Sequence, residues 1–227
     1  MGRFLVEGAA AHPALTLTAE MGRGATRAQV AACRVIIDFS LPDGTARLLE
    51  LVENQALIVG TTGLSPETVA GLAAHAERAP VLRASNFSTG VTLLTELVAR
   101  AARALPDYDL EIVEMHHRHK RDAPSGTARS LAEAAAFARD VSLSERAIYG
   151  REGEVGPRPG GEIGLHAVRG GDVAGEHTVY LAGSGERLML GHLATSRQAF
   201  AEGALRAAAW IADRPAGAYE MRDVLGL

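Results

Sequence analysis

The chain has 227 residues, of which 47% are hydrophobic and 22% charged, and its formal net charge is −4. This composition is that of an ordinary globular protein, and the acidic balance argues against general nucleic-acid binding. The single cysteine excludes an internal disulfide framework. No apolar run reaches the ~18 residues that a membrane span needs, and the N-terminus lacks a signal-peptide pattern, so we expect a cytoplasmic protein without a membrane partner.

The first part of the chain alternates strand patterns with helix patterns. Short apolar runs predict strands over 34–40, 56–63 and 81–90. Amphipathic runs predict helices over 42–54, 65–79 and 91–105. In the second of these helices, Ser65 is a natural N-cap and Pro66 a natural first residue. The alternation predicts an α/β fold with a doubly wound parallel sheet that helices cover on both faces.

The ends of these predicted strands carry small or polar residues, over 38–40, 60–62 and 84–87. Parallel sheets of this kind bind ligands at the carboxyl ends of their strands, and such residues suit a ligand-facing rim. Turns also favour Gly, Ser, Thr and Asn for conformational reasons. The sequence pattern alone leaves both interpretations open.

The second part of the chain has a different character. Residues 109–117 alternate like a half-buried strand, and 126–140 form a strong helix pattern. Residues 160–195 are β-rich and punctuated by glycine, which predicts hairpins, and 199–213 return to a helix pattern. Residues 151–162 read as a long exposed loop of the kind that can carry function. We therefore predict a second, α+β domain.

A cationic cluster lies between the strand at 109–117 and the helix at 126–140. The sequence "EMHHRHKRDAPSGTA" places three histidines, two arginines and a lysine within 116–121. Imidazole transfers protons near neutral pH, lysine supplies a cation or a proton, and a helix N-terminus presents free N–H groups. Gly126 and Thr127 stand at that helix start. The pattern indicates an anion site with an acid–base group, suited to a small carboxylate-bearing molecule.

The cluster has two other interpretations. A run of His, Lys and Arg can be a solvated basic loop with no role, which remains open on residue density alone. The three histidines, His116, His117 and His119, could also bind a transition metal. Adjacent side chains on a strand diverge, however, and no cysteine or carboxylate cluster completes a coordination set. We therefore expect no metal.

The stretch "EMHHRHKRDAPSGTA" resembles the signature of the 4-hydroxy-tetrahydrodipicolinate reductase (dihydrodipicolinate reductase) family. The resemblance continues in order through "VIIDFSLPDGT", "VGTTGL", "ASNFSTGV", "GREGEVGPRPGGEIGLHAVRGGDVAGEHTV" and "YEMRDVLGL", and so spans the chain. It implies NADH- or NADPH-dependent reduction of 4-hydroxy-tetrahydrodipicolinate to tetrahydrodipicolinate in diaminopimelate and lysine biosynthesis.

The resemblance also implies a domain organisation. Residues 1–88 with 199–227 would form a Rossmann-like dinucleotide-binding domain, lacking its first strand. Residues 89–198 would form an α+β domain that binds the dicarboxylate substrate and pairs its sheets into a homotetramer. Hinge closure would bring the cofactor to the substrate.

Carried over by position, the resemblance assigns roles to individual residues. His116 would be the acid–base residue and Lys120 the proton donor, while His117 would contact the substrate. Gly126 and Thr127 would hold a substrate carboxylate. Asp122 and the loop 151–171 would support the site or act as a lid. The cofactor-binding residues would be Met1, Gly2, Glu20, Gly60, Thr61, Thr62, Ala84, Ser85, Asn86 and Phe87.

The N-terminus departs from the family pattern. Members open with a strand and a glycine-rich turn that cradles the cofactor pyrophosphate. Here the chain begins at "MGR", with Gly2 in the place of the last glycine of that turn. Three explanations stay open: a start assigned downstream of the true one, a trimmed sequence, or a chain without the turn. The last would make a catalytically silent dicarboxylate-binding protein the alternative to an enzyme.

The segment between Glu20 and Asp38 is shorter than in many family members. Glu20 is placed to bind the ribose hydroxyls, and a carboxylate there favours NAD because it repels a 2′-phosphate. Arg23 could instead accept that phosphate. The sequence leaves the choice between NADH and NADPH open.

Overall fold

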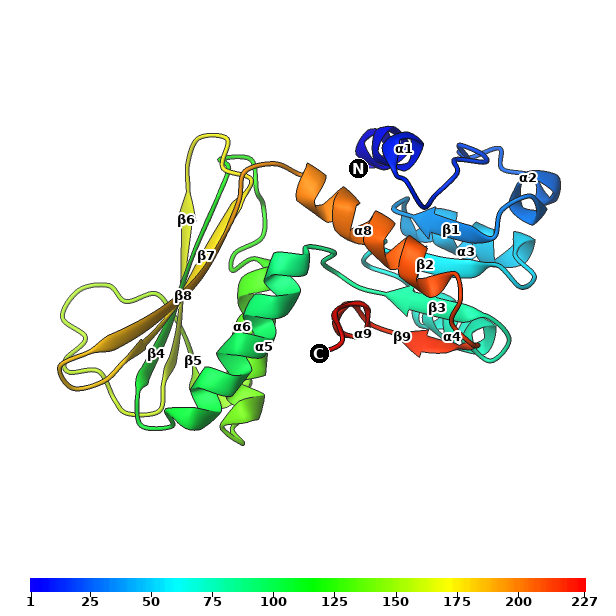
Figure 1. Cartoon of the computed structure of the whole chain (residues 1–227). Helices are drawn as coiled ribbons and strands as arrows, with labels where there is room; N and C mark the ends of the chain where they lie inside the picture. Colours follow the sequence, from blue (N-terminus) through cyan, green and yellow to red (C-terminus); the bar gives the residue numbers. More distant parts are fainter. The chain divides into compact units, whose positions relative to one another are not determined.

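The computed structural model describes residues 1–227, which form two compact units (Figure 1). Unit 1 comprises Met1–Thr89 and Arg197–Leu227, and unit 2 comprises Gly90–Ser196. The boundaries expected from the sequence, after residues 88 and 198, fall close to these. No helix in the chain has the length and apolar character required to span a membrane.

Unit 1 is built on a parallel sheet of four strands in the order β1-β2-β3-β9. The strands are β1 (Val35–Asp38), β2 (Ala56–Val59), β3 (Pro80–Arg83) and β9 (Gly217–Tyr219). All four residues of β2 are buried, as a strand covered on both faces requires. The predicted strands over 34–40, 56–63 and 81–90 are confirmed in shorter form, while β9 was not predicted.

Helices cover both faces of this sheet, which confirms the doubly wound arrangement. One core joins β1, β2 and β3 to the first group, α2 (Arg27–Ala31), α3 (Pro42–Leu51) and α4 (Pro66–Ala76). The other core joins β2 and β3 to the second group, α1 (Gly2–Ala11), α8 (Gln198–Ile211) and α9 (Met221–Leu225). The start of α4 is as predicted, since the Ser65 hydroxyl accepts a hydrogen bond from the Thr68 N–H at 3.2 Å.

Unit 2 contains a mixed sheet of five strands in the order β5-β6-β4-β7-β8. Its strands are β4 (Asp109–His116), β5 (Ala147–Tyr149), β6 (Ile163–Arg169), β7 (Gly175–Ala182) and β8 (Arg187–Ala194). Strands β7 and β8 form an antiparallel hairpin, as predicted. The expectation of hairpins throughout 160–195 is wrong for β6, which pairs in parallel with β4.

The connection after β6 explains this pairing. It crosses the end of β4, where the Gly170 N–H donates to the His116 carbonyl at 3.0 Å and the His117 N–H donates to the Val173 carbonyl at 2.8 Å. The chain therefore passes from one edge of β4 to the other, and β4 gains a partner on both sides. The local pattern of residues cannot distinguish this crossing from a tight hairpin.

One face of this sheet is covered by α5 (Thr89–Ala104) and α6 (Gly126–Ala138), with the short α7 (Leu143–Arg146) following α6. Burial alternates strictly along β4, as the sequence predicts. Leu110, Ile112, Glu114 and His116 are the buried set on the helix-covered face. Two polar side chains thus lie where the alternation calls for apolar ones, at the end of β4 where α6 begins.

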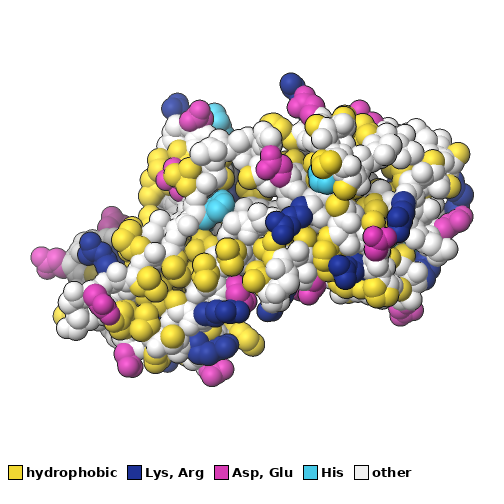
Figure 2. Space-filling view, in the orientation of Figure 1, with side chains coloured by type: hydrophobic (Ala, Val, Ile, Leu, Met, Phe, Trp, Pro, Cys, Tyr) yellow, Lys and Arg dark blue, Asp and Glu magenta, His cyan; other side chains and the backbone are white.

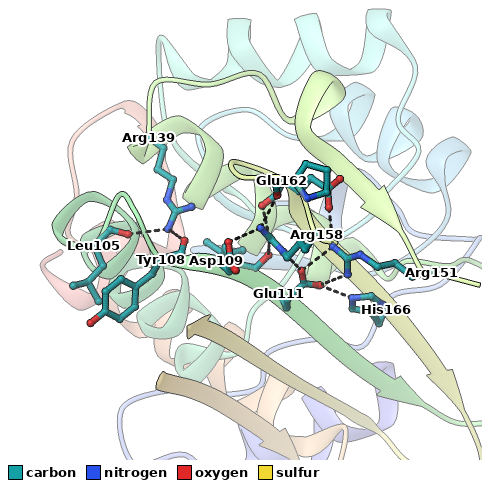
Figure 3. A network of polar contacts seen from close by, with 11 residues as sticks. Leu105, Tyr108, Asp109, Glu111, Arg139, Arg151, Arg158, Glu162 and His166 are labelled. Carbon is teal, nitrogen blue, oxygen red and sulfur yellow. Dashed lines mark hydrogen bonds and ion pairs between the residues drawn. The ribbon is translucent and has the colours of Figure 1, made fainter. Parts of the chain in front are cut away.

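The residues 151–162 form an exposed loop without helix or strand, as predicted. Two of its arginines bind Glu111 on the other face of β4 (Figure 3). Arg151 donates to the Glu111 carboxylate at 2.9 and 3.0 Å, and Arg158 donates to it at 2.8 Å. These ion pairs hold the loop to the sheet. A role for the loop as a lid stays a prediction.

Candidate active site

The predicted cationic cluster lies at the carboxyl end of β4, in the loop that leads to α6. Ser125 caps α6, since its hydroxyl accepts a hydrogen bond from the Ala128 N–H at 3.1 Å. The Ser125 N–H donates to the Glu114 carboxylate at 3.0 Å. The C-terminal end of the loop is thereby anchored to the buried face of β4.

Glu114 is the anchor of this arrangement and has no exposed surface. Arg169 on β6 donates two hydrogen bonds to its carboxylate, at 2.8 and 2.9 Å, and His116 Nδ1 lies 2.5 Å from Oε2. Burial alone would raise the pKa of Glu114, but the hydrogen bonds from Arg169, His116 and the Ser125 N–H together lower it. The side chain is therefore ionised and acts only as an acceptor.

His116 is buried, with its two ring nitrogens in different surroundings. Nδ1 faces the Glu114 carboxylate. Nε2 lies beside Gly175, at which a Cβ atom would come within 3.0 Å of it. The glycine therefore leaves bare backbone beside Nε2, whereas Nδ1 is occupied by Glu114.

His177 on β7 completes a buried polar frame, whose other members are Glu114, His116, Ser125 and Arg169. Its ring stands edge-on to that of His116, with centroids 5.2 Å apart, and its Nε2 lies 3.0 Å from the Ser125 hydroxyl. That hydroxyl already accepts from a backbone N–H, so its proton is available to His177. Burial, with a smaller contribution from His116, lowers the pKa of His177 to about 4. A neutral His177 can therefore accept a hydrogen bond from the Ser125 hydroxyl at physiological pH.

Lys120 lies in the turn after His117, whose carbonyl accepts a hydrogen bond from the Lys120 N–H at 3.1 Å. Its ammonium donates to Asp122 at 2.9 Å, and this hydrogen bond lowers the pKa of Asp122. Arg169 donates to the Asp122 carbonyl at 2.7 Å, which ties the same turn to β6. The His117 ring is half-buried, and its centroid lies 6.2 Å from that of His119.

Gly126 and Thr127 are the first two residues of α6, the end at which the backbone N–H groups of a helix point outward. A Cβ atom placed on Gly126 would meet nothing within 4 Å. Packing therefore does not require glycine there, and the space over the helix start is open. An anion could approach these N–H groups closely.

The structure thus brings His116, His117, Lys120, Gly126 and Thr127 to one end of unit 2, as the sequence predicted. The catalytic and binding roles of these residues stay predictions. The sequence analysis did not single out the groups that hold them, which are Glu114, Ser125, Arg169 and His177. For Glu114 a signal was present, since a charged residue occupies a position of the apolar face in an alternating strand.

The predicted cofactor-binding residues all lie in unit 1. At the ends of β1 and β2, the buried Asp38 carboxylate accepts hydrogen bonds from the Thr45 and Thr61 hydroxyls. The Thr61 hydroxyl therefore acts at the rim of the sheet by holding the Asp38 side chain in place. Gly60 makes room for the Phe39 ring, which an added Cβ would approach within 2.4 Å. Small residues at this rim thus have packing reasons of their own.

The remaining predicted cofactor residues differ in exposure. After β3, the Phe87 ring is buried against Phe39, with centroids 5.0 Å apart. Asn86 Oδ1 accepts a hydrogen bond from the Ser88 N–H at 2.8 Å. The others are Thr62, Ser85, Gly2 and Glu20, which are exposed, and Ala84 and Met1, which are half-buried. Their cofactor contacts stay predictions.

The fold and the site together define a two-unit class of α/β enzymes. A parallel Rossmann-like unit is joined to an α+β unit with acid–base and anion-binding groups. Two family models match the chain, "Dihydrodipicolinate reductase, N-terminus" over residues 1–87 and "Dihydrodipicolinate reductase, C-terminus" over residues 90–225. The chain therefore belongs to the dihydrodipicolinate reductase family, which confirms the resemblance seen in the sequence.

Individual relatives agree with this family. The chain is 53% identical over 201 residues to the 4-hydroxy-tetrahydrodipicolinate reductase of Anaeromyxobacter sp. (strain Fw109-5), covering 87% of the chain and 75% of the relative. It is 50% identical over 198 residues to the 4-hydroxy-tetrahydrodipicolinate reductase of Wolinella succinogenes, covering 86% of the chain and 77% of the relative. The solved structure of the dipicolinate-bound dihydrodipicolinate reductase from Paenisporosarcina sp. TG-14 matches with a TM-score of 0.64 and 28% identity, covering 82% of the chain and 71% of that structure.

Proposed function

We propose that the chain catalyses the NAD(P)H-dependent reduction of 4-hydroxy-tetrahydrodipicolinate to tetrahydrodipicolinate, a step of diaminopimelate and lysine biosynthesis. The observation that carries this proposal is the polar frame at the end of β4, which joins the His116 imidazole to the open start of α6. Relatives that bear the reductase name are 50–53% identical over most of the chain. No observation favours a catalytically silent binding protein.

The residues of unit 1 fit a dinucleotide. Parallel strands end there in small or polar residues, as nucleotide sites require. Gly2 begins α1, and a Cβ atom placed on it would meet nothing within 4 Å, so a phosphate could approach the helix start. The bound reduced nicotinamide supplies the hydride. We assign the binding of its nucleotide to the predicted cofactor residues of unit 1, with the choice between NADH and NADPH open.

In unit 2 the chain's own residues bind the dicarboxylate and move the proton. The N–H groups of Gly126 and Thr127, with the Thr127 hydroxyl, are assigned to one carboxylate. His117 contacts the same substrate. The 4-hydroxyl group of the substrate leaves as water, Lys120 protonates the ring carbon that becomes electron-rich when the hydride adds, and His116 serves as the acid–base group through Nε2. A dicarboxylate ligand agrees with the dipicolinate in the solved relative.

We also propose that the protein is a cytoplasmic homotetramer whose subunits associate through the open face of the unit 2 sheet. The strand register places Val168, Met189 and Leu193 on the face opposite the helices, and these side chains are 43%, 53% and 59% exposed. Hydrophobic side chains are also visible across the surface of this unit in Figure 2. Light scattering on the purified chain tests the proposal, and a monomer at micromolar concentration would contradict it.

A titration tests the enzymatic proposal most directly. NADH and NADPH are titrated into the chain with and without pyridine-2,6-dicarboxylate, and turnover of 4-hydroxy-tetrahydrodipicolinate is followed by the loss of reduced nicotinamide absorbance. We expect nucleotide binding and turnover. If the dicarboxylate binds while neither nucleotide binds nor is oxidised, the reductase proposal fails for this chain and the silent binding protein replaces it.

A further inference from the structure

Glu114 is a fully buried charged residue to which the reaction itself gives no role. Its carboxylate contacts three groups that come from three different parts of unit 2. These are the His116 ring on its own strand, the Arg169 guanidinium on β6, and the Ser125 N–H just before α6. Burying a carboxylate lowers the free energy of unfolding unless the group is paired and fully hydrogen-bonded. Such an arrangement therefore points to a specific role for Glu114.

The first consequence concerns the proton on His116. Arg169 donates to both carboxylate oxygens of Glu114 and keeps the side chain ionised. An ionised carboxylate can only accept hydrogen bonds, so His116 Nδ1 must be the donor in their contact. Neutral His116 therefore carries its proton on Nδ1 and has its lone pair on Nε2.

The second consequence concerns the direction of the ring. With Nδ1 held by Glu114, Nε2 is turned to the bare backbone at Gly175. The groups around the ring are Arg169 from β6, His177 from β7 and Ser125 at the start of α6, with Lys120 and His192 acting electrostatically on His177. Burial and the nearby His116 lower the pKa of His177, so its ring is neutral. The imidazole is thus fixed both in orientation and in tautomer.

The third consequence concerns the start of α6. The Glu114 oxygen Oε1 accepts the Ser125 N–H at 3.0 Å, one residue before Gly126. The other oxygen, Oε2, faces His116. A single carboxylate therefore holds the acid–base ring and the anion-binding helix start in one frame. Their separation does not depend on the exposed residues of the intervening loop.

We propose that Glu114 is the positioning residue of this site: it fixes His116 as the Nδ1–H tautomer, with Nε2 directed to the substrate, and sets the ring against the start of α6. This inference rests on the proposed function, because it takes His116 to exchange a proton with the substrate. Arg169 balances the charge of the ionised Glu114 carboxylate. Neither Glu114 nor Arg169 touches the reacting atoms.

A spectroscopic test does not depend on catalysis. Long-range proton–nitrogen NMR correlations on the wild-type chain identify the tautomer of His116, assigned by comparison with His116→Gln. We expect the Nδ1–H form for the neutral ring, and a predominant Nε2–H form would overturn the proposal. This measurement separates the inference from the proposed function, because a chain without reductase activity would still report its tautomer.

A kinetic test uses Glu114→Gln. The amide keeps an oxygen for the Ser125 N–H but replaces Oε2 with a donor, which removes the acceptor for one hydrogen bond from Arg169 and shifts the His116 proton to Nε2. We expect kcat to fall roughly 10²-fold, the scale of groups that orient a functional imidazole. The Kd of pyridine-2,6-dicarboxylate should change little. An unchanged kcat, or an equal loss of kcat and of dicarboxylate affinity, would overturn the positioning role.

Two matched variants sharpen this result. Glu96→Gln makes the same change in the ion pair that Glu96 forms with Arg100 on α5, outside the site, and we expect it to leave kcat unchanged. In the His116→Ala background, Glu114→Gln should cause no further loss of kcat, because a residue that acts through His116 has nothing left to position. Independent, multiplicative losses in the double variant would contradict the proposal.

Discussion

Glu111 and Glu114 lie on the same strand, β4, and both pair with arginine and histidine, yet their structural roles differ. Glu111 binds Arg151, Arg158 and His166 on the open face of the sheet (Figure 3). Its side chain is 21% exposed, whereas that of Glu114 is wholly buried. The period of two along a strand places residues separated by an odd number of positions on opposite faces. The same chemical groups thus hold a loop on one face and an imidazole on the other.

The comparison shows that a buried ion pair is not evidence of a site by itself. What distinguishes the Glu114 network is the ring nitrogen that it leaves facing unfilled backbone, at Gly175. In the Glu111 network the neighbouring glycine is Gly164, where an added Cβ would lie 1.8 Å from the Glu111 carboxylate, so the nearest atoms there belong to the carboxylate and not to a ring nitrogen. A donor or acceptor position that a polar network leaves unused is therefore a better indication of function than the paired charges alone.

The largest effect that we expect is from Lys120→Ala. Removing the proposed proton donor should lower kcat roughly 10²- to 10⁴-fold, the range for general acid–base groups. Steady-state kinetics with each nucleotide measures this effect. Arg121→Ala is a matched control, because it removes an exposed cation of the same loop and should leave kcat near the wild-type value. A Lys120→Ala enzyme with normal kcat would remove Lys120 from the mechanism.

A smaller effect is expected from Gly175→Ala. The new Cβ would lie 3.0 Å from His116 Nε2 and would crowd the nitrogen that the Glu114 frame exposes, and the φ of +156° at Gly175 adds backbone strain of its own. Because small misplacements of reacting groups are costly, kcat should fall roughly tenfold or more. Gly191→Ala on β8, where an added Cβ would make only ordinary contacts at 3.6 Å or more, is the control. Equal activity of the two variants would contradict the assignment of Nε2.

Thr127→Val tests the anion-binding end of the frame. The substitution removes one hydroxyl donor to the bound carboxylate and keeps the shape of the side chain. A hydrogen bond to a charged group contributes about 1.5–3 kcal/mol, so KM should rise roughly tenfold or more with kcat little changed. Calorimetric titration with pyridine-2,6-dicarboxylate should show the same loss of affinity. An unaltered KM would place the carboxylate elsewhere.

The smallest effect on activity is expected from Glu111→Gln, which should change stability instead. Burial raises the pKa of Glu111, but hydrogen bonds from Arg151, His166 and Arg158 outweigh it and lower the pKa from 4.5 to about 2. A depressed pKa in the folded state stabilises the protein above the unfolded-state pKa, and this contribution is lost as the pH falls toward the folded-state pKa.

Denaturant unfolding between neutral pH and pH 2 measures this contribution. The wild-type chain should lose more free energy of unfolding between about pH 4.5 and 2 than Glu111→Gln does. At neutral pH the variant should be the less stable of the two. Parallel pH curves for the two proteins would show that the ion pairs on the open face contribute little.

The local elements of this protein could be predicted from the sequence because their causes lie a few residues apart. Ser65 accepts a hydrogen bond from the N–H three residues ahead, as its position before Pro66 predicts. The alternation over 109–117 likewise predicts β4 and its two faces. The motif at 114–128 was long enough to indicate the family and the groups of the site.

The frame of the site required the tertiary structure, because it depends on strand pairing between residues far apart in the chain. Arg169 meets Glu114 only because β6 pairs with β4 in parallel, in a register that sets His116 beside Arg169. His177 and Gly175 reach the site because β7 occupies the other edge of β4. The sequence by itself predicted which residues bind an anion and move a proton in the proposed reaction. Only the pairing of β4 with β6 and β7 decided which groups surround the two nitrogens of His116, since local periodicity carries no information about the partner of a strand.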